Sequence, residues 1–409
     1  MSSKKVILLA AIGSALDYYD FMVMVFVSNI IGAQYFPSQY VYNSVLAVFM
    51  TFTVGYLMRP LGGIIFSHFG DKYGRRIAFY FSIILIAIPL FCIALLPTYQ
   101  EIGVLAPILL IILRLIQGLA FGGELPGAVI YTFEHVDLKY RTVAVAFIFS
   151  ILTFAALSGQ LLVTLISHML SKEAFYLWGW RLAFIIGSIF CIAGGYLRKN
   201  LSETPAFIAL KSRKKTLPIA QLFDSDFITL IQGILFASIV SVSMFLIFIF
   251  MPIFLIDFTL IGNHGHIVNA VNLLNVAILT MFFGYISDKF GKKNIFKISL
   301  FCMVVIAYPV FWVVTNTTSL EVVMIMIVLL GIPYAMMLST YATIVSELFP
   351  TSVRYTGLGL VYNVSAILFG ATAPMIVIWL IKLTSNPISV AFYLIFFSFL
   401  ALLGFRFKT

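Results

Sequence analysis

Hydrophobic residues run in long stretches along this chain, and short polar breaks separate one stretch from the next. Each stretch holds about 20 apolar residues or more, the length that an α-helix needs to cross a bilayer. The first stretch follows Lys4 and Lys5 as in a signal peptide, but it resumes after Asp20, which favours one long span. The pattern predicts twelve transmembrane helices, near residues 6–33, 42–67, 75–96, 103–134, 141–169, 178–197, 227–256, 267–287, 295–314, 320–346, 355–381 and 388–406.

The longest polar break divides the predicted helices into two sets of six. It runs from Arg198 to Asp226. We therefore expect an N-terminal half at 1–198, a linker at 199–226 and a C-terminal half at 227–409. Within the linker, Ser202 is a typical N-cap residue and the cluster 211–215 is rich in Lys, so a short amphipathic helix at the membrane surface is predicted.

Composition excludes a water-soluble fold. Of the 409 residues, 62% are hydrophobic and 10% are charged, whereas soluble domains carry about a quarter charged residues. Mean hydropathy is +1.10. The net charge of +10 does not indicate nucleic-acid binding, because the basic residues lie in short clusters between spans rather than on one domain.

The basic residues also predict the orientation of the chain. Outside the spans, almost all Lys and Arg fall on the side that holds the N-terminus, and the exceptions are Lys172, Arg181 and Lys382. Cytoplasmic loops carry such an excess. We expect a multi-pass protein of the plasma membrane, or of the inner membrane in a Gram-negative bacterium, with both termini cytoplasmic.

Two motifs recur at nearly the same interval. The segment 71–76, DKYGRR, matches 288–293, DKFGKK, and the pair Glu134 and Arg141 matches Glu347 and Arg354. A six-helix unit duplicated in parallel orientation explains both matches.

At these motifs the sequence resembles the major facilitator superfamily, which implies an all-α integral membrane fold with twelve transmembrane helices in two six-helix halves. The family motif is complete in Gly284–Lys293, whereas the first copy has Ser67 in place of a Gly. More narrowly, the chain resembles the metabolite:proton symporter family, which includes carriers of proline and betaine, 2-oxoglutarate, citrate and shikimate. The matching segments are ALDYYDF at 15–21, RPLGG at 59–63, GDKYGRR at 70–76, RLIQGLAFGGELPGA at 114–128, LSETPAF at 201–207 and ELFPTSVRYTG at 347–357. The family usually has Glu-Trp-Tyr-Asp-Phe where this chain has Asp17 to Phe21.

The resemblance also implies gating residues at the cytoplasmic helix ends. A simpler interpretation is that these residues only keep positive charge on the cytoplasmic side of the membrane. The two interpretations are compatible. The candidates are Asp71, Arg75, Glu134, Arg141, Asp288, Lys292, Glu347 and Arg354.

Ionisable residues inside the spans are the strongest candidates for function, because each costs about 2.5–3.5 kcal/mol or more at mid-bilayer. Asp17 and Asp20 share one face of the first span, and they lie about 16–21 Å into it at about 1.5 Å per residue. Arg114 lies about 16 Å into the fourth span, from the opposite side. We expect Asp17 or Asp20 to pair with Arg114 and to release it when protonated. A static ion pair is the alternative.

The other two charges inside the spans are ambiguous. Glu124 lies in a Gly-Gly-Glu-Leu-Pro segment, where a proton relay and a structural hydrogen bond are equally supported. Arg59 precedes Pro60 and two glycines, which favours a structural role at a bent helix end over a role as a substrate ligand.

Polar and aromatic residues in the spans give a set of solute-binding candidates. Tyr18 and Tyr19 have faces that attract quaternary ammonium groups, although packing or interface contacts are the favoured explanation in a chain with 20 Tyr. The full set is Tyr18, Tyr19, Arg114, Gln117, Asn272, Asn275, Tyr334 and Asn363, with Gln160 and Trp379 as weaker members. The histidines and the three cysteines have no spacing typical of a metal site, so neither a metal nor a cofactor is expected.

Taken together, these features favour a proton-coupled symporter that imports a small organic solute by alternating access. A zwitterion such as proline or betaine suits the balanced charges. An organic acid such as 2-oxoglutarate, citrate or shikimate is the alternative, and a nontransporting membrane sensor is the alternative of another class. An enzyme is not expected, because no nucleophile or metal constellation is present. The expected partners are the solute, protons and the lipid bilayer, with no nucleic acid, and the family often works as a monomer.

Overall fold

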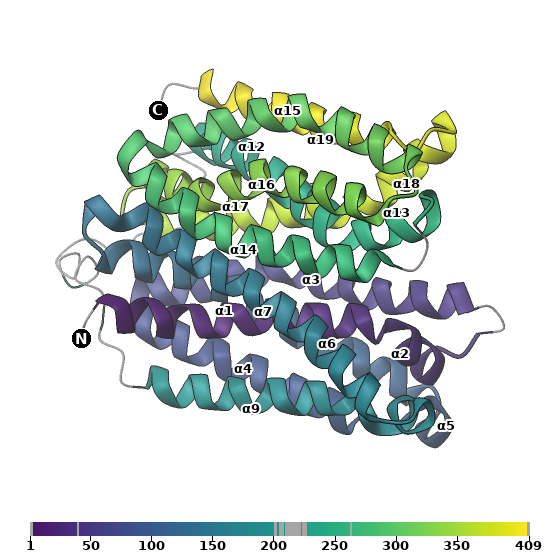
Figure 1. Ribbon diagram of the computed structural model, residues 1–409. Coiled ribbons are helices and arrows are strands. Elements are labelled where there is room, and N and C mark those ends of the chain that lie inside the picture. Colours follow the sequence, from purple (N-terminus) through teal and green to yellow (C-terminus); the bar gives the residue numbers. More distant parts are fainter. Residues whose placement is uncertain are drawn as a thin grey trace. The chain divides into compact units, whose positions relative to one another are not determined.

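The computed structural model describes residues 3–38, 41–199, 203, 208, 222, 227–261 and 264–406 (Figure 1). Within these ranges, the backbone alone is described for residues 3–6, 41–47, 49, 52, 53, 71, 72 and 75. Every regular element in this part of the chain is a helix, as the sequence predicts. The surface helix predicted in the linker falls outside it, apart from single residues.

The chain forms two compact units, each described by itself. Unit 1 comprises Met1–Tyr131 and Phe154–Lys215, and unit 2 comprises Thr132–Thr153 and Thr216–Thr409. The segment Thr132–Thr153 joins unit 2 because it packs closely there: the hydroxyl of Ser150 donates to the carbonyl of Ala277, 2.7 Å away. Two helices, α6 (Leu105–His135) and α7 (Arg141–Met169), are therefore shared between the units.

Unit 1 is a bundle in which α1 and α4 both pack on α9, and α3 packs on α4. Its core is aromatic at one end, where the buried Trp180 ring meets Tyr35 and Phe184 edge-on. Arg181 and Tyr35 donate to the carbonyl of Leu96, which satisfies a backbone acceptor left over at the end of α4. Besides α6 and α7, its helices are α1 (Ser3–Phe26), α2 (Ser28–Tyr35), α3 (Val41–Tyr73), α4 (Arg75–Leu95), α5 (Tyr99–Ile102), α8 (Lys172–Ala174), the π-helical turn η2 (Phe175–Gly179) and α9 (Arg181–Arg198).

Unit 2 is built around α16, which packs on α14 and α15, while α12 packs on α17 and α19. In two spans a π-helical turn precedes a proline, Pro252 or Pro374, whose missing N–H loosens the α-helical ladder. The elements are η1 (Leu138–Tyr140), α12 (Phe227–Met244), η3 (Phe245–Phe250), α13 (Met251–Phe258), α14 (Gly265–Phe290), α15 (Lys292–Asn316), α16 (Leu320–Leu348), α17 (Arg354–Ser365), η5 (Ala366–Ala371), α18 (Ala373–Thr384), α19 (Ser389–Leu403) and η6 (Gly404–Arg406).

The repeated motif has the same backbone conformation in both units. Gly74 separates α3 from α4 with φ of 123°, and Gly291 separates α14 from α15 with φ of 88°. Residues with a side chain rarely adopt a positive φ, so glycine is favoured at both turns. This explains why the motif keeps glycine at the same place in each copy.

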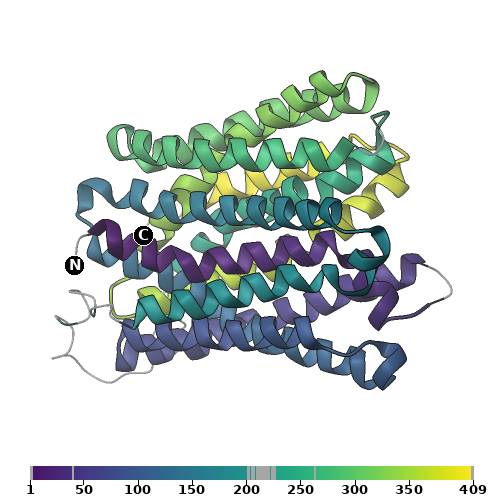
Figure 2. The same cartoon turned by 60° about the horizontal axis from the view of Figure 1, so that its bottom comes forward.

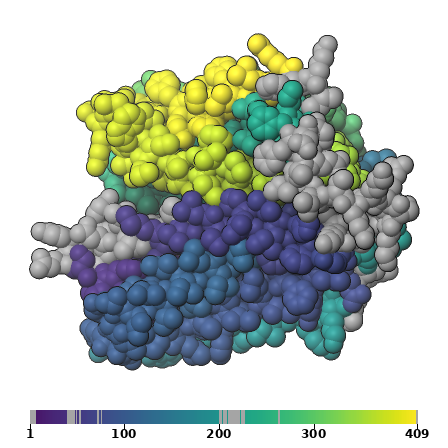
Figure 3. All heavy atoms as spheres, turned by 180° about the vertical axis from the view of Figure 1, so that it is seen from behind, coloured from purple at the N-terminus to yellow at the C-terminus, as the bar shows by residue number. Residues whose placement is uncertain are grey.

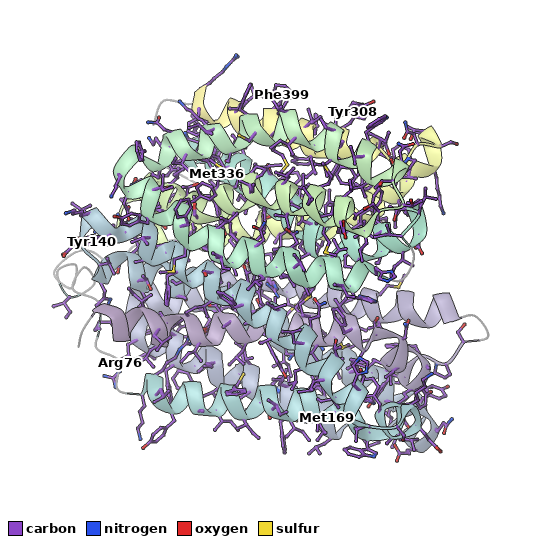
Figure 4. All side chains as sticks on the ribbon, viewed as in Figure 1. Arg76, Tyr140, Met169, Tyr308, Met336 and Phe399 are labelled. Carbon is purple, nitrogen blue, oxygen red and sulfur yellow. The ribbon has the colours of Figure 1, made fainter. Side chains whose placement is uncertain are left out.

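Twelve transmembrane helices result. Eleven segments of the described residues are long and apolar enough to cross a membrane, and α3, with 33 residues, supplies the twelfth. Within each unit the long helices run alongside one another (Figure 2). Large apolar side chains are exposed along the helices, as expected for lipid contact. Figure 3 shows one face of the molecule with all heavy atoms drawn. Tyr308 and Phe399 project outward from unit 2, whereas Met336 is buried within it (Figure 4).

Candidate functional site

A small cavity lies in unit 1, between α1, α3 and α6. Its volume is about 20 Å³, enough for roughly one water molecule. Charged, amide and aromatic side chains share its wall. The lining residues are Asp17, Asp20, Phe21, Gly55, Tyr56, Arg59, Arg114, Gln117, Gly118 and Phe121.

Two buried ion pairs form the polar part of this wall. Arg114 on α6 donates to Asp20 at 2.6 Å, and Arg59 on α3 donates to Asp17 at 2.7 Å. None of the four residues exposes more than 4% of its surface. The charges balance within the cavity, and removing one partner of such a pair would leave an uncompensated charge at a cost of about 3–5 kcal/mol.

The contact between Asp20 and Arg114 agrees with the sequence analysis, which placed the two residues at similar depth in the membrane. The contact between Asp17 and Arg59 was not expected, because Pro60 next to Arg59 indicated a bent helix end. The helix α3 instead continues through Pro60 to Tyr73. Arg59 therefore stays within the span and reaches α1.

Glycines allow α3 and α6 to approach closely enough to form the cavity. A Cβ added to Gly118 would lie 1.9 Å from the carbonyl oxygen of Gly55, and one added to Gly62 would lie 1.9 Å from that of Leu119. Gly118 and Gly122 form a GxxxG pair on α6, a common arrangement where membrane helices cross. This crossing brings Arg59 and Arg114 to the same cavity.

Two oxygen acceptors in the cavity wall lack a donor within the described structure. They are Oδ1 of Asp20 and Oε1 of Gln117, and both are fully buried. The amide nitrogen of Gln117 lies 3.5 Å from the other oxygen of Asp20. Because a buried unsatisfied acceptor costs about 1–3 kcal/mol, the site favours a proton or a donor group at this point.

Aromatic rings form the other part of the wall. The guanidinium carbon of Arg59 lies 4.0 Å from the ring centroid of Tyr56 and 5.4 Å from that of Phe121. Phe21 meets Tyr56 edge-on, with ring centroids 6.4 Å apart. A cation at this point is stabilised by the ring faces as well as by Asp17.

A third ion pair lies in unit 1, away from the cavity. Glu124 on α6 contacts Arg198 at the end of α9, with 2.7 Å between Oε1 and Nη2. Arg198 is fully buried, donates to the carbonyls of Leu9, Ala10 and Phe79, and stacks on the ring of Phe79 at 3.6 Å. The hydroxyl of Ser82 donates to the other oxygen of Glu124.

Sequence reasoning placed Arg198 in the polar break and missed this ion pair. A signal for it exists, because Gly187, Cys191, Gly194 and Arg198 follow one another at helical spacing and all are buried on α9. The contacts of Glu124 favour the structural side of the alternative left open for it.

Unit 2 carries a polar network at one set of helix ends. It involves the ends of α6, α14 and α16 and the starts of α7, α15 and α17. The carboxylate of Asp288 accepts hydrogen bonds from the backbone N–H groups of Thr142 and Val143, at 3.1 and 2.9 Å, and so caps α7. Lys292 contacts Glu347 at 2.6 Å, and Arg354 lies 3.8 Å from Glu134. The contact between Arg354 and Glu134 joins the two copies of the repeated motif, whereas Lys292 and Glu347 both belong to the second copy.

One aromatic ring holds two cations of this network. The guanidinium groups of Arg141 and Arg354 lie 4.3 and 5.1 Å from the centroid of the Phe133 ring. Arg141 also donates to the carbonyl of Val136, and Arg354 to those of Ser346 and Phe349. Six predicted gating residues thus lie in one network, while the side chains of the other two, Asp71 and Arg75, lie outside the described part of the chain.

Comparison with known proteins identifies the family. The model of the Major Facilitator Superfamily matches residues 7–374, most of the chain. The chain belongs to this superfamily. The glycine betaine/proline/ectoine/pipecolic acid transporter OusA of Dickeya dadantii (strain 3937) is 31% identical, with 98% of this chain and 82% of the relative aligned. The proline/betaine transporter of Escherichia coli (strain K12) is 31% identical over 96% of this chain and 80% of its own length.

A solved structure agrees with this assignment at the level of the fold. The proton:xylose symporter XylE, bound to 6-bromo-6-deoxy-D-glucose, superposes with a TM-score of 0.80 at 16% identity, covering 99% of this chain and 95% of its own. The fold is therefore the superfamily fold, with twelve transmembrane helices. Because the family and these relatives are transporters, the prediction that the chain is not an enzyme is confirmed.

The predicted solute-binding residues of this superfamily member are distributed over both units. In unit 1, Arg114 and Gln117 line the cavity, whereas Tyr18 and Tyr19 do not. The hydroxyl of Tyr19 instead donates to the carbonyl of Ala183 on α9, 2.7 Å away. Tyr19 therefore helps to fasten α1 to α9.

The remaining candidates are polar residues of unit 2. Asn272 and Asn275 on α14 face Gly331 of α16, and the amide of Asn275 donates to the carbonyl of Val328. Asn272 is fully buried, and both of its amide atoms lack a hydrogen-bond partner within the described structure. Tyr334 meets Phe248 edge-on, and Asn363 donates to the carbonyl of Gly359 in its own helix.

Proposed function

We propose that this chain is a proton-coupled symporter that imports a small zwitterion, such as proline or betaine, by alternating access. The observation that carries the proposal is the pair of buried ion pairs around one cavity. Four fixed charges of balanced sign suit a solute with one positive and one negative group. The names of the relatives support the same solute class.

In this proposal Asp20 carries the proton. A carboxylate in contact with Arg114 is favoured in its charged form, and desolvation in the span favours its neutral form, so the two states are linked to whether the contact is made. A proton on the unsatisfied Oδ1 of Asp20 would find an acceptor in Oε1 of Gln117, which lines the same cavity. Protonation then releases Arg114 to bind the carboxylate of the solute.

The polar network of unit 2 serves in this proposal as a cytoplasmic latch. Positive residues on the side of the N-terminus support the assignment of that side to the cytoplasm. The latch combines a helix cap at Asp288 with the ion pairs of Lys292 and Arg354. Opening it would let the helix ends separate while the charges near mid-span hold the solute.

We further propose that the protein works as a monomer in the plasma membrane, with the predicted halves at 1–198 and 227–409 as the moving bodies. The excess of Lys and Arg on the side of the N-terminus supports cytoplasmic termini.

Uptake by the purified protein in liposomes tests the proposal. Labelled betaine and proline are supplied with an imposed inward pH gradient, in competition with citrate, 2-oxoglutarate and shikimate. The expected result is accumulation of the zwitterions above their external concentration, which collapses when a protonophore is added.

Other outcomes are equally informative. Uptake of an organic acid without uptake of betaine or proline would replace the zwitterion with an anionic solute. Tight binding of a solute without any flux or counterflow would indicate a sensor, and the symporter proposal would then fall.

A further inference from the structure

Arg59 occupies an aromatic corner of the unit 1 cavity. Its guanidinium group lies over Tyr56 at 4.0 Å, lies near Phe121 at 5.4 Å, and contacts Asp17 at 2.7 Å. Two ring faces and one carboxylate therefore surround a cation of this chain. Such a combination also recognises substituted ammonium groups, in which the positive charge is spread over methyl groups.

We propose that this corner is the subsite for the ammonium group of the solute, and that Arg59 is a resident cation which the solute displaces. The inference rests on the proposed function and adds Tyr56, Phe121 and Arg59 to its solute site. Asp17 becomes the counter-ion of the bound ammonium group. The role of Asp20, which carries the proton, is separate.

The size of the cavity supports such a displacement. A volume of about 20 Å³ holds roughly one water molecule, so a solute enters only when a group of the wall moves. The backbones of α3 and α6 are in direct contact through their glycines across the crossing, so the side chains of the wall are the groups with room to move. The side chain of Arg59 is long and unbranched, and it can leave the rings without moving α3.

Charge balance supports the same exchange. When a zwitterion enters between Arg59 and Asp17, its ammonium group meets Asp17 and the rings, and its carboxylate meets Arg59 and the Arg114 released by Asp20. Every buried charge keeps an opposite neighbour, as a low-dielectric site requires. A solute with a positive group alone would leave Arg59 without an anion. A zwitterion is therefore favoured over a simple cation.

The rings also predict a preference among zwitterions. Betaine carries a quaternary ammonium group without N–H donors, so its recognition depends on ring faces. Proline carries two N–H donors, which can bond to the carboxylate of Asp17 whether or not a ring face is present. Removing a ring face should therefore weaken betaine more than proline.

The first test compares Tyr56→Leu with Tyr56→Phe in purified protein, with equilibrium binding and the transport KM measured for betaine and for proline. We expect Tyr56→Leu to weaken betaine about tenfold and proline less than about threefold. Tyr56→Phe keeps the ring face and should keep the wild-type ratio of the two affinities. The matched control is Tyr196→Leu, at an exposed position of α9. Equal losses for both solutes, or none, would overturn the proposal.

The second test addresses Arg59 directly and needs no transport. Tetramethylammonium is used as the probe in equilibrium binding to detergent-solubilised protein, with thermal unfolding as the check that each variant is folded. We expect Arg59→Gln to bind this cation at least about tenfold more tightly than the wild type, because the corner is vacant and Asp17 lacks its partner. Phe121→Leu, combined with Arg59→Gln, should remove the gain.

The two proposals fail in different ways. If the wild type neither binds nor transports betaine or proline while Arg59→Gln gains tetramethylammonium binding, the solute class falls and the cation subsite stands. If the wild type transports betaine but neither Tyr56→Leu nor Arg59→Gln behaves as described, the subsite falls and the symporter stands.

Discussion

Units 1 and 2 each carry one copy of the segment found at 71–76 and 288–293, yet they bury different kinds of polar group. The described part of unit 1 buries three ion pairs, and each of them contacts α1. Two pairs include an aspartate of α1, Asp17 or Asp20. In the third, Arg198 donates to the carbonyls of Leu9 and Ala10 on α1. The described part of unit 2 buries mainly amides and hydroxyls, such as Asn272 and Thr343. Its ion pairs lie at helix ends, and that of Lys292 and Glu347 is partly exposed. In the described residues, unit 1 thus buries ion pairs, whereas unit 2 buries mainly uncharged polar groups.

The largest expected effect concerns proton coupling, which we assign to unit 1 and not to unit 2. Asp20→Asn removes the group that we assign to proton transfer, so proton-driven accumulation of betaine in liposomes should fall to the external concentration, while counterflow exchange persists. Asn272→Ala in unit 2 should raise KM and leave the accumulation ratio dependent on the pH gradient. Retained uphill uptake by Asp20→Asn would remove Asp20 from the coupling mechanism.

The next effect concerns stability. Arg198→Met leaves Glu124 charged and buried without its partner, which should destabilise the protein by about 3–5 kcal/mol. The double variant Arg198→Met with Glu124→Met removes both charges and should recover most of that loss. Thermal unfolding in detergent measures both. The control is Arg76→Met, at an exposed arginine of α4 whose guanidinium contacts no carboxylate within the described structure and donates only to the carbonyl of Lys199 (Figure 4). A double variant as unstable as the single one would contradict the role of Glu124.

The smallest effect is expected at the surface of unit 2. Lys292→Gln breaks an ion pair whose side chains are 24% and 34% exposed, and exposed pairs contribute about 0–1 kcal/mol. Thermal unfolding should therefore change little, and the wild-type pair should matter less still in high salt. A loss as large as that of Arg198→Met would show that the latch in unit 2 is as essential to the fold as the buried pairs of unit 1.

The sequence predicted the twelve spans, because apolar length alone determines where a helix can cross a membrane. It also predicted the depth at which Asp20 and Arg114 meet, since rise per residue is constant along a helix. It did not predict which way each helix turns its charged side chain. Arg59 therefore seemed to belong to a bend and Arg198 to a loop, and only the contacts that the two residues make with α1 showed where their side chains lie.

The spacing of glycines in the second and fourth spans was a signal in the sequence that the prediction of the site did not use. Gly55 and Gly62 on α3 face Gly118 and Gly122 on α6, and their four positions follow helical periodicity. A search for small residues at such spacing in two spans would have predicted the crossing, and with it the neighbourhood of Arg59 and Arg114.

The π-helical turns η3 and η5 give two spans of unit 2 one surplus residue each within the turn. If the surplus moves along the helix by a turn, the residues that it passes rotate by about 100° around the axis, while both helix ends stay in place. Migration of the π-helical turn would therefore change the direction of a short row of side chains without tilting the helix.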